Sequence, residues 1–200
     1  MYYPLMDPPV NEKDFSKMSK KEAEKVFEWY TKEIPHRLSL LKKAYLLSGG
    51  EGDIFDYSSD SLKALWSWYI KNVNVVPKSE EEYQKQVRAL PAHIGSFVLK
   101  DKVEMVWVQI AMDIGIYMAL CLLKHGGRLK WGIFFKPRTL YSVNRPVIVG
   151  FTKSMCFDSM NIMSTQIFKV AKSKSEGNEL YNLFHVWIGY VEIGEEPEGR

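Results

Sequence analysis

One acidic side chain, Asp113, lies near the middle of a long apolar segment that runs from Val103 to Gly127. A carboxylate in apolar surroundings must be paired, accept hydrogen bonds or take up a proton. Two interpretations of this residue stay open. In the first, Asp113 belongs to a buried polar network with Tyr117 or with a basic partner. In the second, it is the centre of a small-molecule enzyme site with Tyr117, Lys130 or Lys136.

Few other residues stand in patterns that catalysis requires. The four histidines have no metal-ligand spacing between them and no Cys-x-x-Cys occurs, so we expect neither a metal nor a cofactor. The serines lack the glycine-flanked turn of hydrolase nucleophiles. The glycine-rich stretch Gly49–Gly52 lacks the lysine and hydroxyl of a phosphate-binding loop and is better explained as a helix stop. These patterns favour a non-catalytic protein and leave enzyme activity open.

Composition predicts one folded domain. The chain has 200 residues, of which 46% are hydrophobic and 14% aromatic, which is enough for a core and too apolar for disorder. The net charge of +3 is small and both signs are mixed, so no nucleic-acid surface is predicted. Cys121 and Cys156 lie beside apolar residues and the N-terminus has no secretory signal, which favours the cytoplasm. We predict a single domain over residues 1–200, with 1–15 and 194–200 at its periphery.

The segment Met105–Leu123 is long and apolar enough to be considered as a membrane span. A central Asp costs about 2.5–3.5 kcal/mol on insertion scales, and each large apolar residue returns about 0.3–0.6 kcal/mol, so energy alone does not decide. The polar residues fall on one side of an α-helix: Lys102, Gln109, Asp113 and Lys124. This arrangement predicts a core helix and no membrane span.

The N-terminal region carries helix signals. Ser19 and Glu22 form a capping box, and apolar residues follow it at helical spacing as far as Ile34. Pro35 would remove a hydrogen bond from a continuing helix. We therefore expect Pro35 in the first turn of a second helix, which ends at Gly49-Gly50, so that the region forms a helical hairpin or a sharply kinked helix.

A third helix is predicted to begin at Ser58 or Ser59. Trp66 and Trp68 either form a stacking platform for bases or sugars or, as the helical spacing favours, place Trp66 in an aromatic core and leave Trp68 partly exposed. The polar stretch Pro77–Pro91 is predicted to be a loop with a short helix.

After the central helix the pattern changes towards a sheet. Arg128–Phe135 and Val147–Phe151 are rich in branched and aromatic residues and are predicted strands. Met163–Lys172 has mixed apolar spacings and is either helix or strand, whereas Glu179–Val191 is predicted to be helical. The sequence thus predicts an α+β fold, with N-terminal helices and a long central helix, Val103–Leu123, packed on a small, mainly antiparallel sheet.

Several short segments carry a resemblance that follows the order of the chain. They are Phe27–Tyr30, Ile34–Leu38, Asp56–Ser58, Ser61–Leu62, Leu65–Trp68, Asp113–Tyr117, Trp131, Lys136–Pro137 and Asn144–Phe151. Together they resemble a family of small bacterial cytoplasmic proteins without an established activity. Relatives of this type often carry Gly-Glu where this chain has Ala119-Leu120, so a site that used that glutamate would be incomplete here. In its helices followed by a small sheet, the family is similar to immunity proteins of bacterial toxin systems.

The function predicted from these observations is non-catalytic binding through protein–protein contact. The resemblance implies that the partner is another protein such as a toxin. Exposed aromatic candidates for the contact are Tyr2, Tyr3 and Trp68. The alternative is a small-molecule enzyme with a site around Asp113 and Tyr117.

Basic residues flank the predicted sheet at Lys130, Lys136 and Arg138. They either meet an acidic partner or form a solvated basic edge. The predicted binding residues are therefore Asp113, Tyr117, Lys130, Lys136 and Arg138, without nucleic acid, metal or cofactor.

Overall fold

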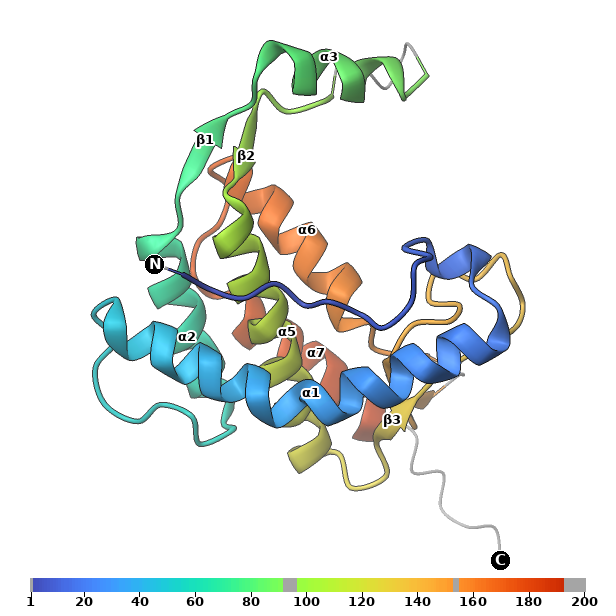
Figure 1. Ribbon diagram of the computed structural model, residues 1–200. Helices are drawn as coiled ribbons and strands as arrows, with labels where there is room; N and C mark the ends of the chain where they lie inside the picture. The colour runs from blue at the N-terminus through green and yellow to red at the C-terminus, as the bar shows by residue number, and fades with distance from the viewer. Residues whose placement is uncertain (1, 92–96, 153–154, 193–200) are drawn as a thin grey trace, which may run out of the picture.

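The computed structural model describes residues 2–91, 97–152 and 155–192 (Figure 1). Its helices are α1 (Lys20–Leu47), α2 (Ser59–Asn72), α3 (Glu80–Arg88), α5 (Met105–His125), α6 (Ser159–Ala171) and α7 (Glu179–Glu192), preceded by a 3-10 turn at Phe15–Lys17. Two separate antiparallel strand pairs complete the fold: β1 (Val75–Pro77) with β2 (Asp101–Val103), and β3 (Lys130–Gly132) with β4 (Val147–Val149). The predicted α+β fold is confirmed.

Helix α5 is the centre of the structure. It contacts α1, α2, α6 and α7, and Ile110 and Ile114 are fully buried, as predicted. Ile148 of β4 joins the same hydrophobic core. Among the described residues, α5 alone is long and apolar enough to cross a membrane, and 67% of its most apolar window is buried within the protein. The helix therefore has the surroundings of a core helix.

Helix α1 is one continuous helix of 28 residues, and the prediction that Pro35 begins a second helix is wrong. The predicted capping box is present, with the Glu22 amide donating to Ser19 Oγ at 3.3 Å. Pro35 lies on the exposed side of the helix, where the missing hydrogen bond costs about 3 kcal/mol. Ile34 and Leu41 are buried on the opposite side. Each such side chain contributes about 1.5–3 kcal/mol when buried, so the buried face outweighs the cost of the proline.

Helix α2 begins at Ser59, with Ser58 as its N-cap, as predicted. Trp66 is fully buried and stacks on Tyr69, with ring centroids 4.7 Å apart. Trp68 is also buried, which corrects the prediction of partial exposure. Its ring packs between Tyr45 of α1 and Trp107 of α5, because both helices extend over this side of α2.

The segment with ambiguous spacing, Met163–Lys172, lies mostly in helix α6. Its spacing is mixed because α6 has apolar residues on two faces. Met163 and Val170 are buried in the core and Ile167 is partly buried against it, whereas Phe168 is exposed on another side of the helix. The predicted C-terminal helix is confirmed as α7. Residues 194–200 lie outside the described part of the chain.

The strands β1 and β2 and the helix α3 form an arm, residues 75–91 and 97–103, that projects from the rest of the protein (Figure 1). Helix α3 has no buried residue. Local contacts hold it: a capping box between Ser79 and Glu82, and an ion pair in which Lys102 Nζ lies 2.6 Å from Glu82 Oε2. The short helix predicted within Pro77–Pro91 is thus confirmed.

Two helical glycines offer a matched test of the packing between α5 and α6. A Cβ at Gly115 would lie 2.6 Å from Met163 Cγ and 3.2 Å from the Ser159 carbonyl oxygen, whereas a Cβ at Gly189 in α7 would meet no atom within 4 Å. We expect Gly115→Ala to lower the free energy of unfolding by about 1–3 kcal/mol through overpacking. Gly189→Ala should raise it by about 0.5–1 kcal/mol. Denaturant unfolding measures both, and a stabilising effect at Gly115 would contradict the close packing.

Candidate functional site

Asp113 lies at the junction of α5, α1 and the N-terminal segment. Arg37 Nε donates to Asp113 Oδ1 at 2.9 Å, and Arg37 Nη2 lies 2.8 Å from Oδ2. The Tyr3 hydroxyl donates to the same Oδ2. The exposed fractions of Asp113, Arg37 and Tyr3 are 0%, 3% and 7%. The prediction of a buried, hydrogen-bonded Asp113 is confirmed, with Arg37 as its basic partner.

Burial and the local charges act in opposite directions on this cluster. Burial raises the pKa of the Asp113 carboxyl, while the hydrogen bonds and charge of Arg37 act to lower it. Burial, followed by the Asp113 charge, raises the pKa of the Tyr3 hydroxyl far above its usual range. Tyr3 therefore remains a proton donor to Asp113. The carboxylate accepts hydrogen bonds from the Tyr3 hydroxyl and Arg37 Nε and makes an ion pair with Arg37 Nη2, and this is the environment of a structural junction.

The same cluster fixes the N-terminal segment, which was expected at the periphery. Arg37 Nη1 donates to the Pro4 carbonyl at 2.8 Å, and the Met6 amide donates to Gln109 Oε1 at 3.1 Å. Tyr3, predicted as an exposed aromatic contact, is instead buried, while Tyr2 is exposed as predicted. The N-terminal segment is held because its first residues satisfy charges that α1 and α5 bury.

Tyr117 belongs to a different polar cluster from Asp113. Its hydroxyl accepts from the Tyr57 amide at 2.9 Å and lies 2.8 Å from Ser61 Oγ. Burial raises the pKa of Tyr117 above its usual range, and it raises that of the Cys121 thiol to about 12. The structure therefore does not join Asp113 and Tyr117 in one constellation.

The predicted basic residues lie on the surface. Lys130 begins β3, and Lys136 and Arg138 lie on the chain that follows it. All three are exposed, and none of their side chains makes a hydrogen bond or ion pair with a described residue. They are not brought to the buried Asp113. Within the described ranges, His, Cys, Asp and Glu side chains form no group of three that could hold a metal, and His93 lies outside those ranges.

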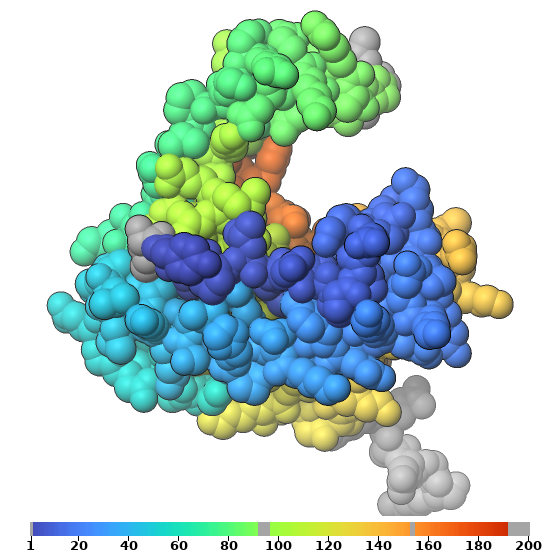
Figure 2. Space-filling model, viewed as in Figure 1, coloured from blue at the N-terminus to red at the C-terminus, as the bar shows by residue number. Residues whose placement is uncertain are grey.

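A large cavity among the described residues lies between the arm and α6. It is an apolar groove of about 670 Å³, within the size range of ligand pockets. In Figure 2 the surface is hollowed between the arm and the N-terminal segment, with α6 visible at the floor. Helix α6 supplies Ser164, Ile167, Phe168 and Ala171, and the arm supplies Gln86, Ala89, Leu90, Phe97, Val98, Leu99 and Val103. We call this cavity the arm groove.

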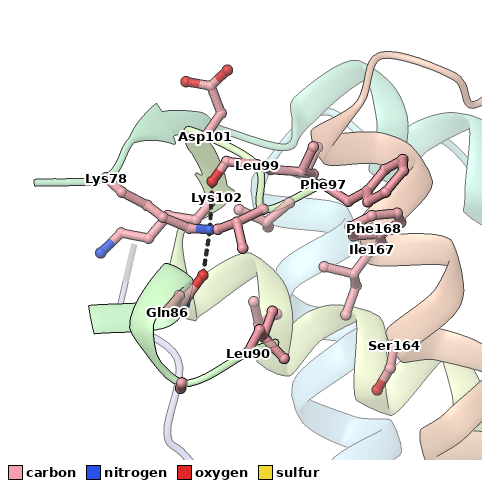
Figure 3. A pocket seen from close by; sticks show the side chains of 15 residues that line it. Lys78, Gln86, Leu90, Phe97, Leu99, Asp101, Lys102, Ser164, Ile167 and Phe168 are labelled. Atoms are coloured by element: carbon pink, nitrogen blue, oxygen red, sulfur yellow. Dashed lines mark hydrogen bonds between the residues drawn. The ribbon is translucent and has the colours of Figure 1, made fainter. Parts of the chain in front are cut away.

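Large apolar side chains line the arm groove and remain open to solvent. The exposed fractions are 68% for Phe97, 46% for Phe168 and 41% for Leu90. Figure 3 shows Leu90 and Ile167 across the cavity from one another. Sequence reasoning missed this site, because the two walls are far apart in the chain. The available signal was the second apolar face of α6.

One cation is fixed in the wall of the arm groove. Lys78 Nζ donates to Gln86 Oε1 and to the Leu99 carbonyl, both at 2.7 Å (Figure 3). Both acceptors are neutral. The ammonium is thus oriented by the arm itself.

A second, smaller cavity lies below the N-terminal segment. Its volume is about 200 Å³, and its lining includes Met6, Trp29, Tyr30, Met112 and Met160. This volume is below the usual range of about 300–1,000 Å³ for ligand sites. The arm groove is therefore the stronger candidate site.

Comparison of the chain with known protein families, with curated proteins and with solved structures found no match. The site is accordingly interpreted from its own geometry.

Proposed function

We propose that this protein is a non-catalytic binding protein that acts through protein–protein contact, with the arm groove as its docking surface. The observation that carries the proposal is the set of exposed apolar side chains, Leu90, Phe97 and Phe168, around one groove. Contiguous apolar surface of this kind marks interaction sites, and aromatic residues contribute strongly to interface energies.

The chemistry of the groove also favours binding over catalysis. Its charged lining residues are Lys78, Asp101 and Lys102, and Lys102 is already paired with Glu82. No histidine or cysteine is among the lining residues described. An enzyme site at Asp113 would require Tyr3 and Arg37 to release the carboxylate, which costs several kcal/mol when the remaining charge stays buried.

We further propose that the partner is a cytoplasmic protein, and that the role is immunity-like. The sequence segments resemble a family whose helices followed by a small sheet are similar to immunity proteins of bacterial toxin systems, and this similarity supports a toxin as that partner. Lys130, Lys136 and Arg138 are a second region for contact, because their exposed charges are free of ion pairs with described residues. Exposed charges of this kind mainly increase association rates with an acidic partner.

The proposal predicts that one substitution in the groove removes partner binding. Phe168→Asp places a charge on the apolar wall, and we expect the affinity for a partner recovered from cells to fall at least about 30-fold, as for an interface hot spot. The matched control is Val186→Asp, because Val186 is an exposed apolar residue of α7 outside the groove lining. Affinity purification with each variant, followed by calorimetric titration, measures the difference. A partner that both variants bind equally well would contradict the proposal.

A further inference from the structure

We infer that the segment which occupies the arm groove is an amphipathic α-helix of the partner, carrying an acidic residue that pairs with Lys78. This inference rests on the proposed function and specifies the chemistry of the partner. It follows from the two helices that border the groove and from the charge fixed in its wall.

Helix α6 presents an incomplete packing face to the groove. Its lining residues Ser164, Ile167, Phe168 and Ala171 repeat at i, i+3, i+4 and i+7. Such rows form the ridges and grooves by which helices pack on one another. On the other wall, Gln86 lies in the last turn of α3, and Ala89 and Leu90 follow the end of that helix at Arg88. A helix inserted into the groove would complete the packing of the α6 row and cover Leu90.

Helix α3 has a particular need for such a neighbour. It has nine residues, none of them buried, and helices shorter than about 12 residues are marginal in water. Its capping box and the pair between Lys102 and Glu82 hold it locally. Tertiary packing normally supplies the main part of helix stability. A partner helix packed against Leu90, two residues beyond the end of α3, would supply tertiary packing to this end of the arm.

Small residues on both walls allow a helix to approach closely. Ala89 lies at the end of α3, and Ser164 and Ala171 lie at the two ends of the α6 row. The larger Ile167 and Phe168 lie between them. Alternation of large and small residues lets facing helices interdigitate. An apolar row of side chains on the partner helix could therefore pack against the groove with complementary shape.

The charge in the groove favours an anionic ligand. Lys78 is partly buried and its two hydrogen-bond acceptors are neutral. Its charge acts on the exposed Glu82 carboxylate, but that carboxylate makes its ion pair with Lys102 and not with Lys78. An ammonium has three donors, so one N–H of Lys78 remains for a ligand. Lys172 adds a second cation, with Nζ 4.4 Å from the centroid of the Phe168 ring. Asp101 is exposed, and Figure 3 shows its carboxylate pointing away from the cavity.

A peptide selection tests the inference directly. Random peptides of about 16 residues, roughly four helical turns, are selected on the wild-type protein and measured by fluorescence anisotropy. We expect the selected peptides to carry apolar residues at i, i+3, i+4 and i+7 together with Asp or Glu, and to become helical when bound. Lys78→Gln should weaken them about tenfold, and Lys78→Arg should bind within a few-fold of wild type.

Matched changes separate the charge from the shape of the arm. A peptide with its acid changed to the amide should bind the wild-type protein weakly and show no further loss on Lys78→Gln. Gln86→Met removes one acceptor of Lys78 and keeps the charge, so acidic peptides should still bind. Circular dichroism and melting temperature check that each variant is folded.

The outcomes distinguish this inference from the proposed function. Peptides that lose binding on Phe168→Asp but are extended, or are insensitive to Lys78→Gln, would overturn the acidic helix and leave the docking surface in place. Selected peptides that are all insensitive to Phe168→Asp would overturn both. Sedimentation that shows a dimer dissociated by Phe168→Asp would assign the groove to a second copy and also overturn the inference.

Discussion

Replacement of Asp113 by alanine should lower the free energy of unfolding by about 3–5 kcal/mol, because it leaves the Arg37 charge buried without its acceptor. The Tyr3 hydroxyl would lose its acceptor in the same step. The cluster joins three parts of the chain, so its loss should release the N-terminal segment as well as weaken the contact of α1 with α5. Denaturant unfolding gives the change in free energy, and hydrogen exchange at the Met6 amide reports the release.

Matched variants separate the charge from the packing at this junction. Tyr3→Phe removes one hydrogen bond to a charged group and should cost about 1.5–3 kcal/mol. The double variant Arg37→Met with Asp113→Leu removes both buried charges, and it should recover most of the stability that Asp113→Ala loses. A double variant as unstable as Asp113→Ala would show that the charge pair itself stabilises the fold. An unchanged melting temperature for Asp113→Ala would contradict the buried ion pair.

Local features of the fold could be predicted from the sequence because neighbouring residues determine them. Ser19 and Glu22 are three residues apart and form the capping box that the sequence indicates. The apolar surroundings of Asp113 in the sequence were sufficient to predict its burial. Pro35 was misjudged because local preference favours a helix break, whereas the buried face of α1 runs past it on the other side. Trp68 was misjudged because helices α1 and α5 cover it.

The contacts that define the candidate sites depend on chain segments far apart. Arg37 is 76 residues from Asp113, and Tyr3 is 110 residues away. Helical periodicity places Arg37 on the same face as Ile34 and Leu41, and this was the one signal that it is buried. The sequence contained a weaker signal for the arm groove. Its walls come from α3 and α6, and only the packing of the whole chain brings them to one cavity.

Removal of the arm should abolish binding at the groove and leave the rest of the protein folded. The strand register pairs Pro77 with Asp101, so an Asn-Gly turn in place of residues 78–100 would close the hairpin with a favoured two-residue connection. Helix α3 has no buried residue, and β1 and β2 are retained in this variant. Peptides selected on the wild-type protein should show no measurable binding, because one wall of the groove and Lys78 are both lost.

The stability of the shortened protein is the control for this experiment. A loss of about 1 kcal/mol lowers the melting temperature by about 2–4 °C in a protein of this size, and we expect a change of that order with cooperative unfolding retained. Phe168→Asp alters the opposite wall and keeps the arm, so the two variants should lose the same peptides. Peptides that bind the shortened protein as tightly as the wild type would place the docking surface elsewhere. Loss of cooperative unfolding would show instead that the arm contributes to the core. Helix α6 would then depend on the apolar side chains of the arm that line the groove together with Ile167 and Phe168.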